Sequence, residues 1–365
     1  MLNVIFTLDY EIHGNGEGCP HALMVEPTYR MMDLFDQYGA TLTIMADVAE
    51  ILKFKEYKEQ NGRDDYHYEA IANQLREAVC RGHDVQLHLH ASYFNAQFKD
   101  GHWEQDWSEY NFASLPLERL NEIVRIGKEY LEALLRPVNP RYACRAFRAA
   151  NWAVSPSRNV VRALVNNGIR IDTSVFKHGR REGIVSFDYS TAHSDLVPWP
   201  ADENNICQRD ERGKLLEIPI YCERRWIGAF LTANRINRAL MGRAHRVLAA
   251  PLNGSQGESR RSLSRLKFFS RIPNFARRHA WKADFNQCTG QQLIKAIRRA
   301  CRKSDASRQQ ELPFVLIGHS KLFTEGNQRS LAPFLAFVTR QRTQLRFGTF
   351  PFCYGDVHLP LGARY

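Results

Sequence analysis

The sequence lacks several features that would place it quickly in a protein class. No window of the 365 residues contains a run of about 20 apolar residues, which a membrane-spanning helix needs. The eight cysteines form no CxxC pair and no zinc-ribbon spacing, so reduced and mostly buried thiols are the simplest interpretation. Neither a GxGxxG loop nor a GxSxG turn occurs, and we therefore expect neither a nucleotide loop of that type nor a serine nucleophile.

The N-terminus also lacks the pattern of an export signal. Residues 3–9 alternate in the manner of a strand and carry an acid at position 9, with no basic segment ahead of a long apolar stretch. We expect a protein that is made and kept in the cytoplasm. The hydrophobic content of 44% is enough for a sizeable core, which excludes disorder as the main state and fits one domain over residues 1–365.

Acidic residues are scarce in one stretch of the chain. Residues 224–303 hold 19 Lys or Arg against two acids, a charge of +17, whereas the rest carries −6, which together give the formal +11. We interpret residues 224–283 as a basic insertion. Apolar and basic side chains mix in residues 250–280, which predicts peripheral contact with an anionic membrane; no nucleic-acid module is recognisable, so no specific nucleic acid is expected as a partner.

Strands alternate with helices along the rest of the chain. The expected strands cover residues 3–9, 40–45, 84–90, 142–148, 169–172, 215–220, 314–319 and 345–350, and the expected helices cover 27–38, 68–80, 117–135, 157–167, 289–303 and 331–340. This order predicts parallel βα units, whose functional residues gather at the carboxyl ends of the strands. A closed barrel and an open doubly wound sheet both fit the pattern.

Ionisable side chains stand at the ends of three of these strands. Asp9 and Glu11 are spaced by two residues, as are His88 and His90, so each pair points to one side of an extended chain. A carboxylate with two imidazoles leaves coordination positions open, as hydrolytic metals require, and His319 after an apolar strand suits a general acid. Each pattern alone is also common among ordinary core or surface histidines, but their joint occurrence indicates a site.

These segments, in this order, resemble the polysaccharide deacetylase family, also called the NodB-homology domain or carbohydrate esterase family 4. The similar segments are FTLDYE (6–11), GATLTI (39–44), GHDVQLH (82–88), FRAA (147–150), IDTS (171–174) and LIGH (316–319). The first has the Asp-x-Glu form of the atypical subgroup found in O-antigen and surface polysaccharide biosynthesis. The resemblance covers about residues 3 to 350, apart from the insertion, and implies an α/β fold, a distorted (β/α)7-type barrel.

The resemblance also implies roles for the residues that carry chemistry. Asp9 would be the base that deprotonates the attacking water, and Arg148 would hold it through a salt bridge. His319 would be the general acid that protonates the leaving amine. An arginine beside the carboxylate would keep Asp9 ionised and oriented, which fits these roles on physical grounds.

Glu11 and His88 would be ligands of a divalent metal, with zinc expected. The family's second ligand histidine lies four residues after the first, where this chain has Ser92. His90 is the natural substitute, because a strand aims it to the same side as His88. A metal-poor, inactive relative is the alternative.

Four further residues are candidates for substrate binding. They are Trp103, Trp107, Trp152 and Glu217. Aromatic side chains stack on sugar faces, and an acid inside an apolar strand can meet a substrate or Arg148. Ordinary packing of the tryptophans and a structural salt bridge of Glu217 are equally compatible with the sequence.

Taken together, these features predict a metal-dependent hydrolase of amide carbon–nitrogen bonds. We expect it to deacetylate an N-acyl amino sugar or a lipid-linked saccharide that is a precursor of surface polysaccharide or lipopolysaccharide. The expected location is the cytoplasm, with a peripheral position at the inner membrane face. The alternative is a catalytically decayed basic protein that binds an anionic membrane surface or nucleic acid through the insertion.

Overall fold

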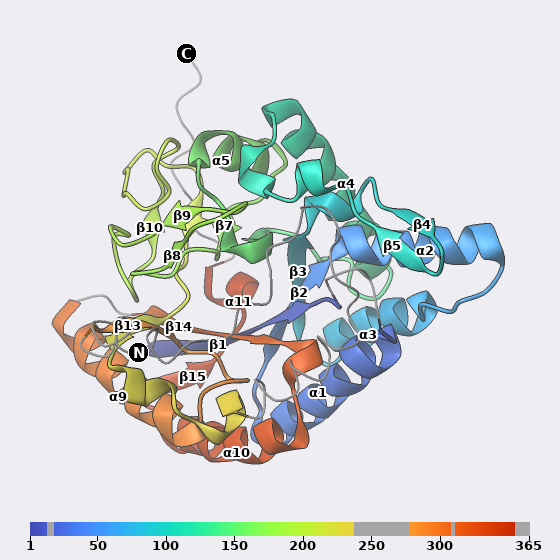
Figure 1. Ribbon diagram of the computed structural model, residues 1–365. Coiled ribbons are helices and arrows are strands. Elements are labelled where there is room, and N and C mark those ends of the chain that lie inside the picture. Colours follow the sequence, from blue (N-terminus) through green and yellow to red (C-terminus); the bar gives the residue numbers. More distant parts are fainter. Residues whose placement is uncertain (13–17, 237–276, 308–310, 355–365) are drawn as a thin grey trace, which may run out of the picture.

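A mainly parallel sheet forms the centre of the molecule in the computed structural model, which describes residues 1–12, 18–236, 277–307 and 311–354 (Figure 1). Its strand order is β10-β11-β7-β6-β3-β2-β1-β14, and β15 also pairs with β1. The strands are β1 (Leu2–Tyr10), β2 (Leu42–Asp47), β3 (Asp84–Leu89), β6 (Ala146–Ala149), β7 (Ile171–Asp172), β10 (Trp199–Pro200), β11 (Leu216–Glu217), β14 (Leu312–His319) and β15 (Leu345–Phe347). Only the pair of β10 with β11 is antiparallel within this sheet.

Two isolated bridges join the far end of the sheet to β14. Ile220, which follows β11, pairs in parallel with Val315, and Asp284 pairs in parallel with Ile317. The chain segments that carry these bridges also meet each other through main-chain hydrogen bonds. The sheet therefore curls back toward its first strand, and the predicted distorted (β/α)7-type barrel is confirmed, whereas an open doubly wound sheet does not fit.

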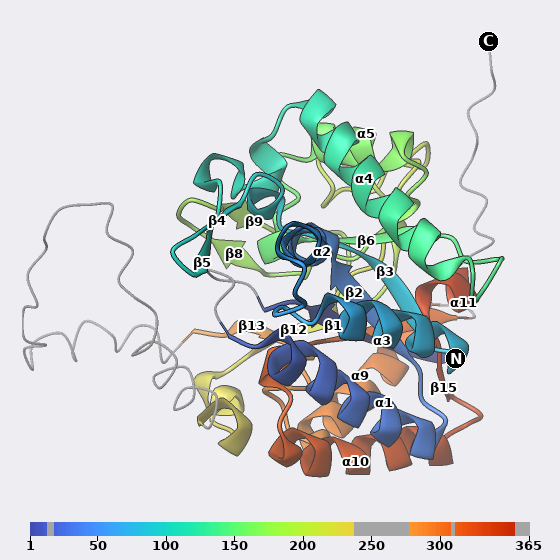
Figure 2. The same ribbon diagram turned by 90° about the vertical axis from the view of Figure 1, so that its right-hand side faces the viewer.

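Helices cover the outside of the curled sheet, as Figures 1 and 2 show. The helices are α1 (Glu26–Tyr38), α2 (Val48–Asn61), α3 (Tyr68–Cys80), α4 (Leu117–Leu135), α5 (Ser157–Asn166), α9 (Gly290–Ser307), α10 (Glu325–Arg340) and α11 (Phe350–Tyr354). Helix α4 packs closely on β3 because its middle carries Gly127, where a Cβ atom would lie 2.8 Å from Leu87. No helix in these described segments has the length and apolar character needed to cross a membrane.

Three two-stranded ribbons extend from the barrel. They are β4 (Gln97–Lys99) with β5 (His102–Glu104), β8 (Arg180–Arg181) with β9 (Phe187–Asp188), and β12 (Cys222–Arg225) with β13 (His279–Lys282). The last ribbon holds both ends of the predicted basic insertion, of which residues 237–276 lie outside the described residues. Most of the predicted membrane-facing segment 250–280 therefore also lies outside them.

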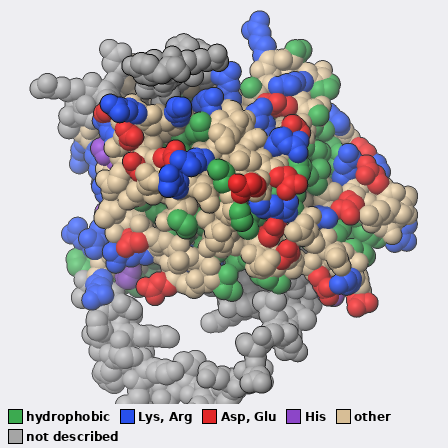
Figure 3. Space-filling view, turned by 90° about the horizontal axis from the view of Figure 1, so that it is seen from above, with side chains coloured by type: hydrophobic (Ala, Val, Ile, Leu, Met, Phe, Trp, Pro, Cys, Tyr) green, Lys and Arg blue, Asp and Glu red, His purple; other side chains and the backbone are tan. Residues whose placement is uncertain are grey.

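Charges of both signs are interspersed on the face of the molecule shown in Figure 3. Lysines, arginines and acids alternate there with apolar and other side chains. The excess of positive charge in the sequence therefore forms no continuous patch on the described part of this face.

Candidate active site

Strand register brings the predicted residues to one edge of the sheet. Asp9 of β1 lies opposite His319 of β14, and His88 of β3 lies opposite both Arg148 of β6 and Asp47 of β2. Because these strands are parallel, their carboxyl ends meet at the same mouth of the barrel.

Asp9 lies between the guanidinium group of Arg148 and the imidazole of His319. Arg148, which is fully buried, donates from Nη1 to Asp9 Oδ1 at 2.8 Å, and His319 Nε2 lies 3.5 Å from Asp9 Oδ2. Burial alone would raise the pKa of Asp9, but the charges of Arg148, His319 and His88 outweigh it and lower the pKa below its usual value. Asp9 is therefore ionised at neutral pH, with one oxygen anchored and the other turned to His319.

Arg148 owes its position to contacts with β1 and with the residue that follows β7. Its Nη1 also donates to Thr7 Oγ1 at 2.8 Å, and its Nε donates to the Thr173 carbonyl at 3.0 Å. Most of its donors thus have partners, which compensates for the burial of a guanidinium.

His319 ends β14 with a neutral side chain. Burial lowers the pKa of the His319 imidazole, although the negative charge of Asp9 acts in the opposite direction. Its main-chain amide donates to Asn286 Oδ1 at 2.6 Å, which fixes the end of the strand. The imidazole is therefore ready to accept a proton at neutral pH, and Nε2 is the atom that faces Asp9.

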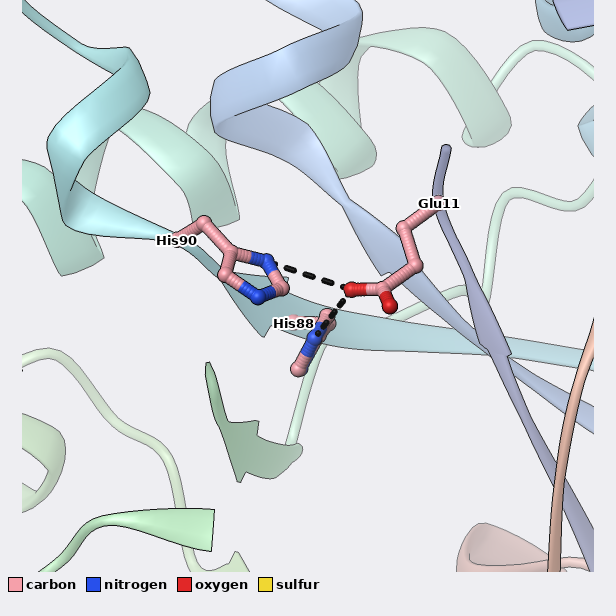
Figure 4. A group of neighbouring side chains, drawn as sticks. All are labelled: Glu11, His88 and His90. Carbon is pink, nitrogen blue, oxygen red and sulfur yellow. Dashed lines mark hydrogen bonds and ion pairs between the residues drawn. The ribbon is translucent and has the colours of Figure 1, made fainter. Parts of the chain in front are cut away.

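Glu11, His88 and His90 form a candidate metal centre, drawn in Figure 4. Glu11 Oε2 lies 3.2 Å from both His88 Nε2 and His90 Nδ1, and all three side chains are buried. Around a tetrahedral ion with ligand distances of about 2.1 Å, neighbouring donor atoms lie roughly 3.4 Å apart. The three predicted ligands are thus together, at a spacing that a divalent ion fits.

Outer contacts orient the two histidines. His88 Nδ1 lies 2.8 Å from the Arg148 carbonyl, so this nitrogen carries the proton and Nε2 is left to face Glu11. His90 Nδ1 lies 2.8 Å from Asp47 Oδ2, and the His90 amide donates to Asp47 Oδ1 at 3.1 Å. Asp47 therefore holds the His90 main chain through Oδ1 and places its other oxygen beside the same ring nitrogen that faces Glu11.

Protons and lysine balance the negative charge of this cluster. Burial lowers the pKa of His88, but the hydrogen bond with Glu11 and the charges of Asp9, Glu11 and Asp47 outweigh it and raise the pKa to about 9. Lys321 Nζ lies 2.9 Å from Glu11 Oε1, the oxygen that faces away from the histidines. A divalent ion held by these donors would take the place of the His88 proton. The oxygen and nitrogen donors present are those that zinc and similar ions prefer.

Sequence reasoning missed Asp47, Lys321 and Glu50, a buried acid that accepts the Ile12 amide at 2.8 Å. Burial and the charge of Asp47 raise the pKa of Glu50 to about 8. For Asp47 a signal exists, because it is the polar end of an apolar strand, as the recognised site residues are. The other two lie on a helix and in a short turn, where strand periodicity gives no signal.

Of the four predicted substrate-binding residues, Trp152 lies beside the site and Trp107 is exposed. The Trp152 ring lies 6.3 Å from the His319 ring, so Trp152 reaches the site. Trp107 is 43% exposed and lies 5.0 Å from the ring of Tyr110.

The other two are enclosed by protein. Trp103 is buried among the rings of Tyr57, Tyr66 and Phe98. Glu217 is fully buried, and its Oε1 accepts the Val175 amide at 3.1 Å. Neither side chain is open to a ligand in this structure, and the suggested pairing of Glu217 with Arg148 is not formed.

Comparison of the sequence with protein-family models and with curated proteins finds no match. Among solved structures, a protein named as a polysaccharide deacetylase from Mycobacterium smegmatis has 12% identity and a TM-score of 0.48, covering 96% of this chain and 87% of its own. One named as a glycoside hydrolase/deacetylase from Parabacteroides distasonis has 13% identity and a TM-score of 0.48, covering 96% and 68%.

A CE4 family pseudoenzyme from Bacillus anthracis covers 46% of this chain and 41% of its own, at 11% identity and a TM-score of 0.28. Polysaccharide deacetylases and CE4 family members are thus among the structures to which the chain is similar, as its motifs predicted. At this identity the likeness concerns the fold alone. The roles of individual residues depend on their contacts in this chain.

Proposed function

We propose that this protein is a metal-dependent hydrolase of amide bonds that removes the acetyl group from an amino sugar in a precursor of surface polysaccharide or lipopolysaccharide. One observation carries the proposal: an ionised carboxylate, Asp9, lies between a buried arginine and a neutral histidine, two residues from the Glu11, His88 and His90 cluster. A base, a proton carrier and a metal-binding set at one barrel mouth are the parts that amide hydrolysis requires.

Glu11, His88 and His90 would hold the divalent ion, with zinc as the expected metal. Such an ion lowers the pKa of a water molecule, polarises the acyl carbonyl and balances the oxyanion that forms on attack. A weak base then suffices for proton removal, which suits a carboxylate of lowered pKa such as Asp9.

Asp9 accepts the proton of the attacking water through Oδ2, because Arg148 occupies Oδ1. His319 Nε2, which faces the same Oδ2, takes the proton from Asp9 and delivers it to the leaving amine. The neutral resting state of His319 supports this order, since an imidazole that is already protonated cannot accept a proton. The Trp152 ring beside His319 forms part of the wall against which the sugar lies.

The proposed location, in the cytoplasm and peripheral at the inner membrane face, rests on the composition of the sequence. Residues 250–280 would supply the membrane contact. Vesicle binding of the full chain, compared with a chain that lacks these residues, tests this part by itself.

Metal removal and readdition test the activity. The full-length protein is stripped with a chelator, reloaded with zinc and assayed for acetate release from N-acetylated saccharides. We expect release only after reloading, and a loss of roughly 10² to 10⁴ in rate for His319→Ala with the metal retained. His102→Ala, in the β4–β5 hairpin, is the matched control. A folded protein that binds no divalent ion would refute the proposal, and full activity of His319→Ala would refute the proton transfer.

The second candidate function is that of a catalytically decayed basic protein that binds an anionic membrane surface or nucleic acid. The observation that favours it is the Lys321 ammonium 2.9 Å from Glu11 Oε1, which supplies positive charge within the cluster itself. Metal analysis of the purified protein decides between the two candidates. A protein that binds anionic vesicles or nucleic acid but takes up no zinc is the decayed form.

A further inference from the structure

Lys282, the last residue of β13, brings a cation to the wall of the candidate active site. Its Nζ lies 3.2 Å from the centroid of the Trp152 ring and 4.5 Å from that of Phe176. The same Trp152 ring lies 6.3 Å from the His319 ring. One aromatic side chain therefore separates Lys282 from the histidine assigned to proton transfer.

The Lys282 ammonium has no ionic partner within the described segments of the chain. No carboxylate there lies within ion-pair distance of Nζ, and Nζ makes no hydrogen bond with the described residues. The aromatic faces of Trp152 and Phe176 attract the cation but supply no acceptor for its three N–H donors. Burial lowers the pKa of Lys282 to about 8, although the charges of Asp284 and Asp9 oppose this. Lys282 is half-buried, and a partly enclosed cation without an ionic partner is the kind of group that is concentrated at functional sites.

The turn that carries Trp152 to this position has an unusual backbone. Asn151 and Trp152 both have positive φ angles, of 55° and 59°. Bulky residues rarely adopt this left-handed conformation, and it persists only where surrounding contacts enforce it. Here the Tyr189 hydroxyl donates to the Trp152 carbonyl at 2.5 Å. The stacking of Trp152 with Lys282 is thus built into a constrained segment.

The ribbon of β12 and β13 extends this positive charge outward. Lys282 pairs with Cys222, and Ala280 pairs with Arg224. Side chains two residues apart on a strand share a face, so Arg224 lies on the same face of the ribbon as Lys282, about 7 Å along it. Arg224 is exposed and also has no carboxylate partner among the residues that the structure describes.

A cavity of about 430 Å³ lies at the outer end of the ribbon. Its lining is Arg224, Arg225, Trp226, Ala229 and Arg278, which includes three arginines and no acid. An anionic group is the ligand that such a lining attracts, and an aromatic ring beside it suits a sugar.

We propose that Lys282 binds a negatively charged group of the saccharide substrate, a carboxylate or a phosphate, next to the amide that is cleaved. Arg224 and the arginine-lined cavity receive a further part of the same anionic chain. This inference rests on the proposed function, because it specifies which saccharides that site takes. A neutral sugar would displace water from the ammonium and give it no partner, whereas an anionic sugar supplies the missing charge.

Binding measured by calorimetry on the full-length protein tests the proposal. The probes are a neutral N-acetylated disaccharide, the matched disaccharide with a uronic acid carboxylate, and an N-acetylated sugar phosphate. We expect at least one charged probe to bind about tenfold or more tightly than the neutral one, and added salt to weaken only the charged probes. The two charged probes distinguish a carboxylate from a phosphate.

Substitution of Lys282 shows whether this residue carries the preference. Lys282→Met keeps an unbranched chain over Trp152 and should remove the preference, while Lys282→Arg should keep it. Lys214→Met, which alters an exposed lysine before β11, should leave all affinities unchanged. Equal affinity for charged and neutral probes, no binding of either charged probe, or an equal loss for every probe in Lys282→Met would overturn the proposal. If Lys282→Met fails to fold, the salt dependence of the wild type and the Arg224→Met variant give the same test.

These outcomes are separable from the activity itself. Charge-dependent binding through Lys282 without acetate release under any metal refutes the proposed function and leaves this inference standing. Acetate release without a preference for charged substrates does the reverse.

Discussion

Two pairs of buried acids at the strand ends of the same barrel have opposite surroundings. Asp9 and Glu11, at the end of β1, each lie within 2.9 Å of a cationic nitrogen, from Arg148 and Lys321. Asp172 of β7 and Glu217 of β11 lie side by side in register, and neither has a cation within ion-pair distance among the described residues. Backbone amides bond to one oxygen of each of these acids instead: the Ser174 amide donates to Asp172 Oδ2 and the Val175 amide to Glu217 Oε1.

The difference shows that burial alone does not decide what a strand-end acid does. Burial raises the pKa of Asp172 and Glu217, and nothing nearby reverses it fully, so this pair retains a proton. Burial acts on Asp9 in the same direction, but the neighbouring cations reverse the effect. The first pair faces cations and has the chemical roles proposed above, whereas the second positions the backbone. Ser174 Oγ bonds to Asp172 and accepts the Ala149 amide, one residue after Arg148.

The largest expected effect comes from replacing a glutamate of the first pair by glutamine and comparing it with the same replacement in the second pair. Glu11→Gln should reduce divalent metal affinity by more than the roughly 10- to 100-fold typical of a group that only orients a ligand. Acetate release should fall to background, because Glu11 Oε2 faces both histidines. Metal content and hydrolysis measured together check this. Glu217→Gln is the matched control, and retained metal in Glu11→Gln would contradict the assignment.

The next largest effect concerns turnover with the metal in place. Asp9→Asn should lower the rate by roughly 10² to 10⁴, because an amide cannot accept the proton of the attacking water. Metal content should stay unchanged, since Asp9 is not among the three grouped donors. A melting curve provides the control for folding. Loss of metal together with activity would show instead that Asp9 is a ligand.

A smaller effect is expected one contact further from the metal. Asp47→Asn should weaken metal affinity by about 10- to 100-fold, because Asp47 Oδ1 accepts the His90 main-chain amide at 3.1 Å and so holds His90 in position. Competition with a chelating dye measures the affinity. A change confined to turnover, with unaltered affinity, would contradict the orienting role.

The smallest expected effect concerns the second pair of acids. Glu217→Gln should leave acetate release within about twofold of the wild type. In the wild type, the folded protein keeps a proton on Glu217, whereas the unfolded chain releases it once the pH exceeds the ordinary pKa of a glutamic acid. The free energy of unfolding therefore falls as the pH rises. The variant lacks that loss, and its melting temperature at pH 8 should equal or exceed that of the wild type. A lower value at pH 8 would mean that Glu217 is ionised in the folded protein.

Strand-end reasoning predicted the fold and the centre of the site for a physical reason. Parallel strands end at one edge, so residues at alternate positions of different strands converge there, as Asp9, Glu11, His88 and His90 do. Helices α3 and α4 have the predicted bounds, because their apolar faces are regular and are followed closely by Gly82 and Pro137. Helix α2 was missed, since it begins directly after β2 with no break.

The same reasoning could not reach residues placed by long-range pairing. Lys282 meets β12 across more than fifty residues, so no local pattern connects it with Trp152. Lys321 lies in the turn Ser320–Leu322, where the direction of the side chain depends on the turn geometry. Glu217 has the strand-end pattern of a site residue, but only its neighbours show whether a cation is present.

The pairing of β12 with β13 has a consequence for how this protein can change over time. The two strands tie the chain together on both sides of residues 237–276, and the segments next to them complete the curled sheet. The barrel contacts therefore do not depend on the length of the chain between those two strands. The entropic cost of closing a longer connection grows only slowly with its length. Evolution or an engineer can exchange that stretch as a cassette while the barrel and its chemical groups stay in place.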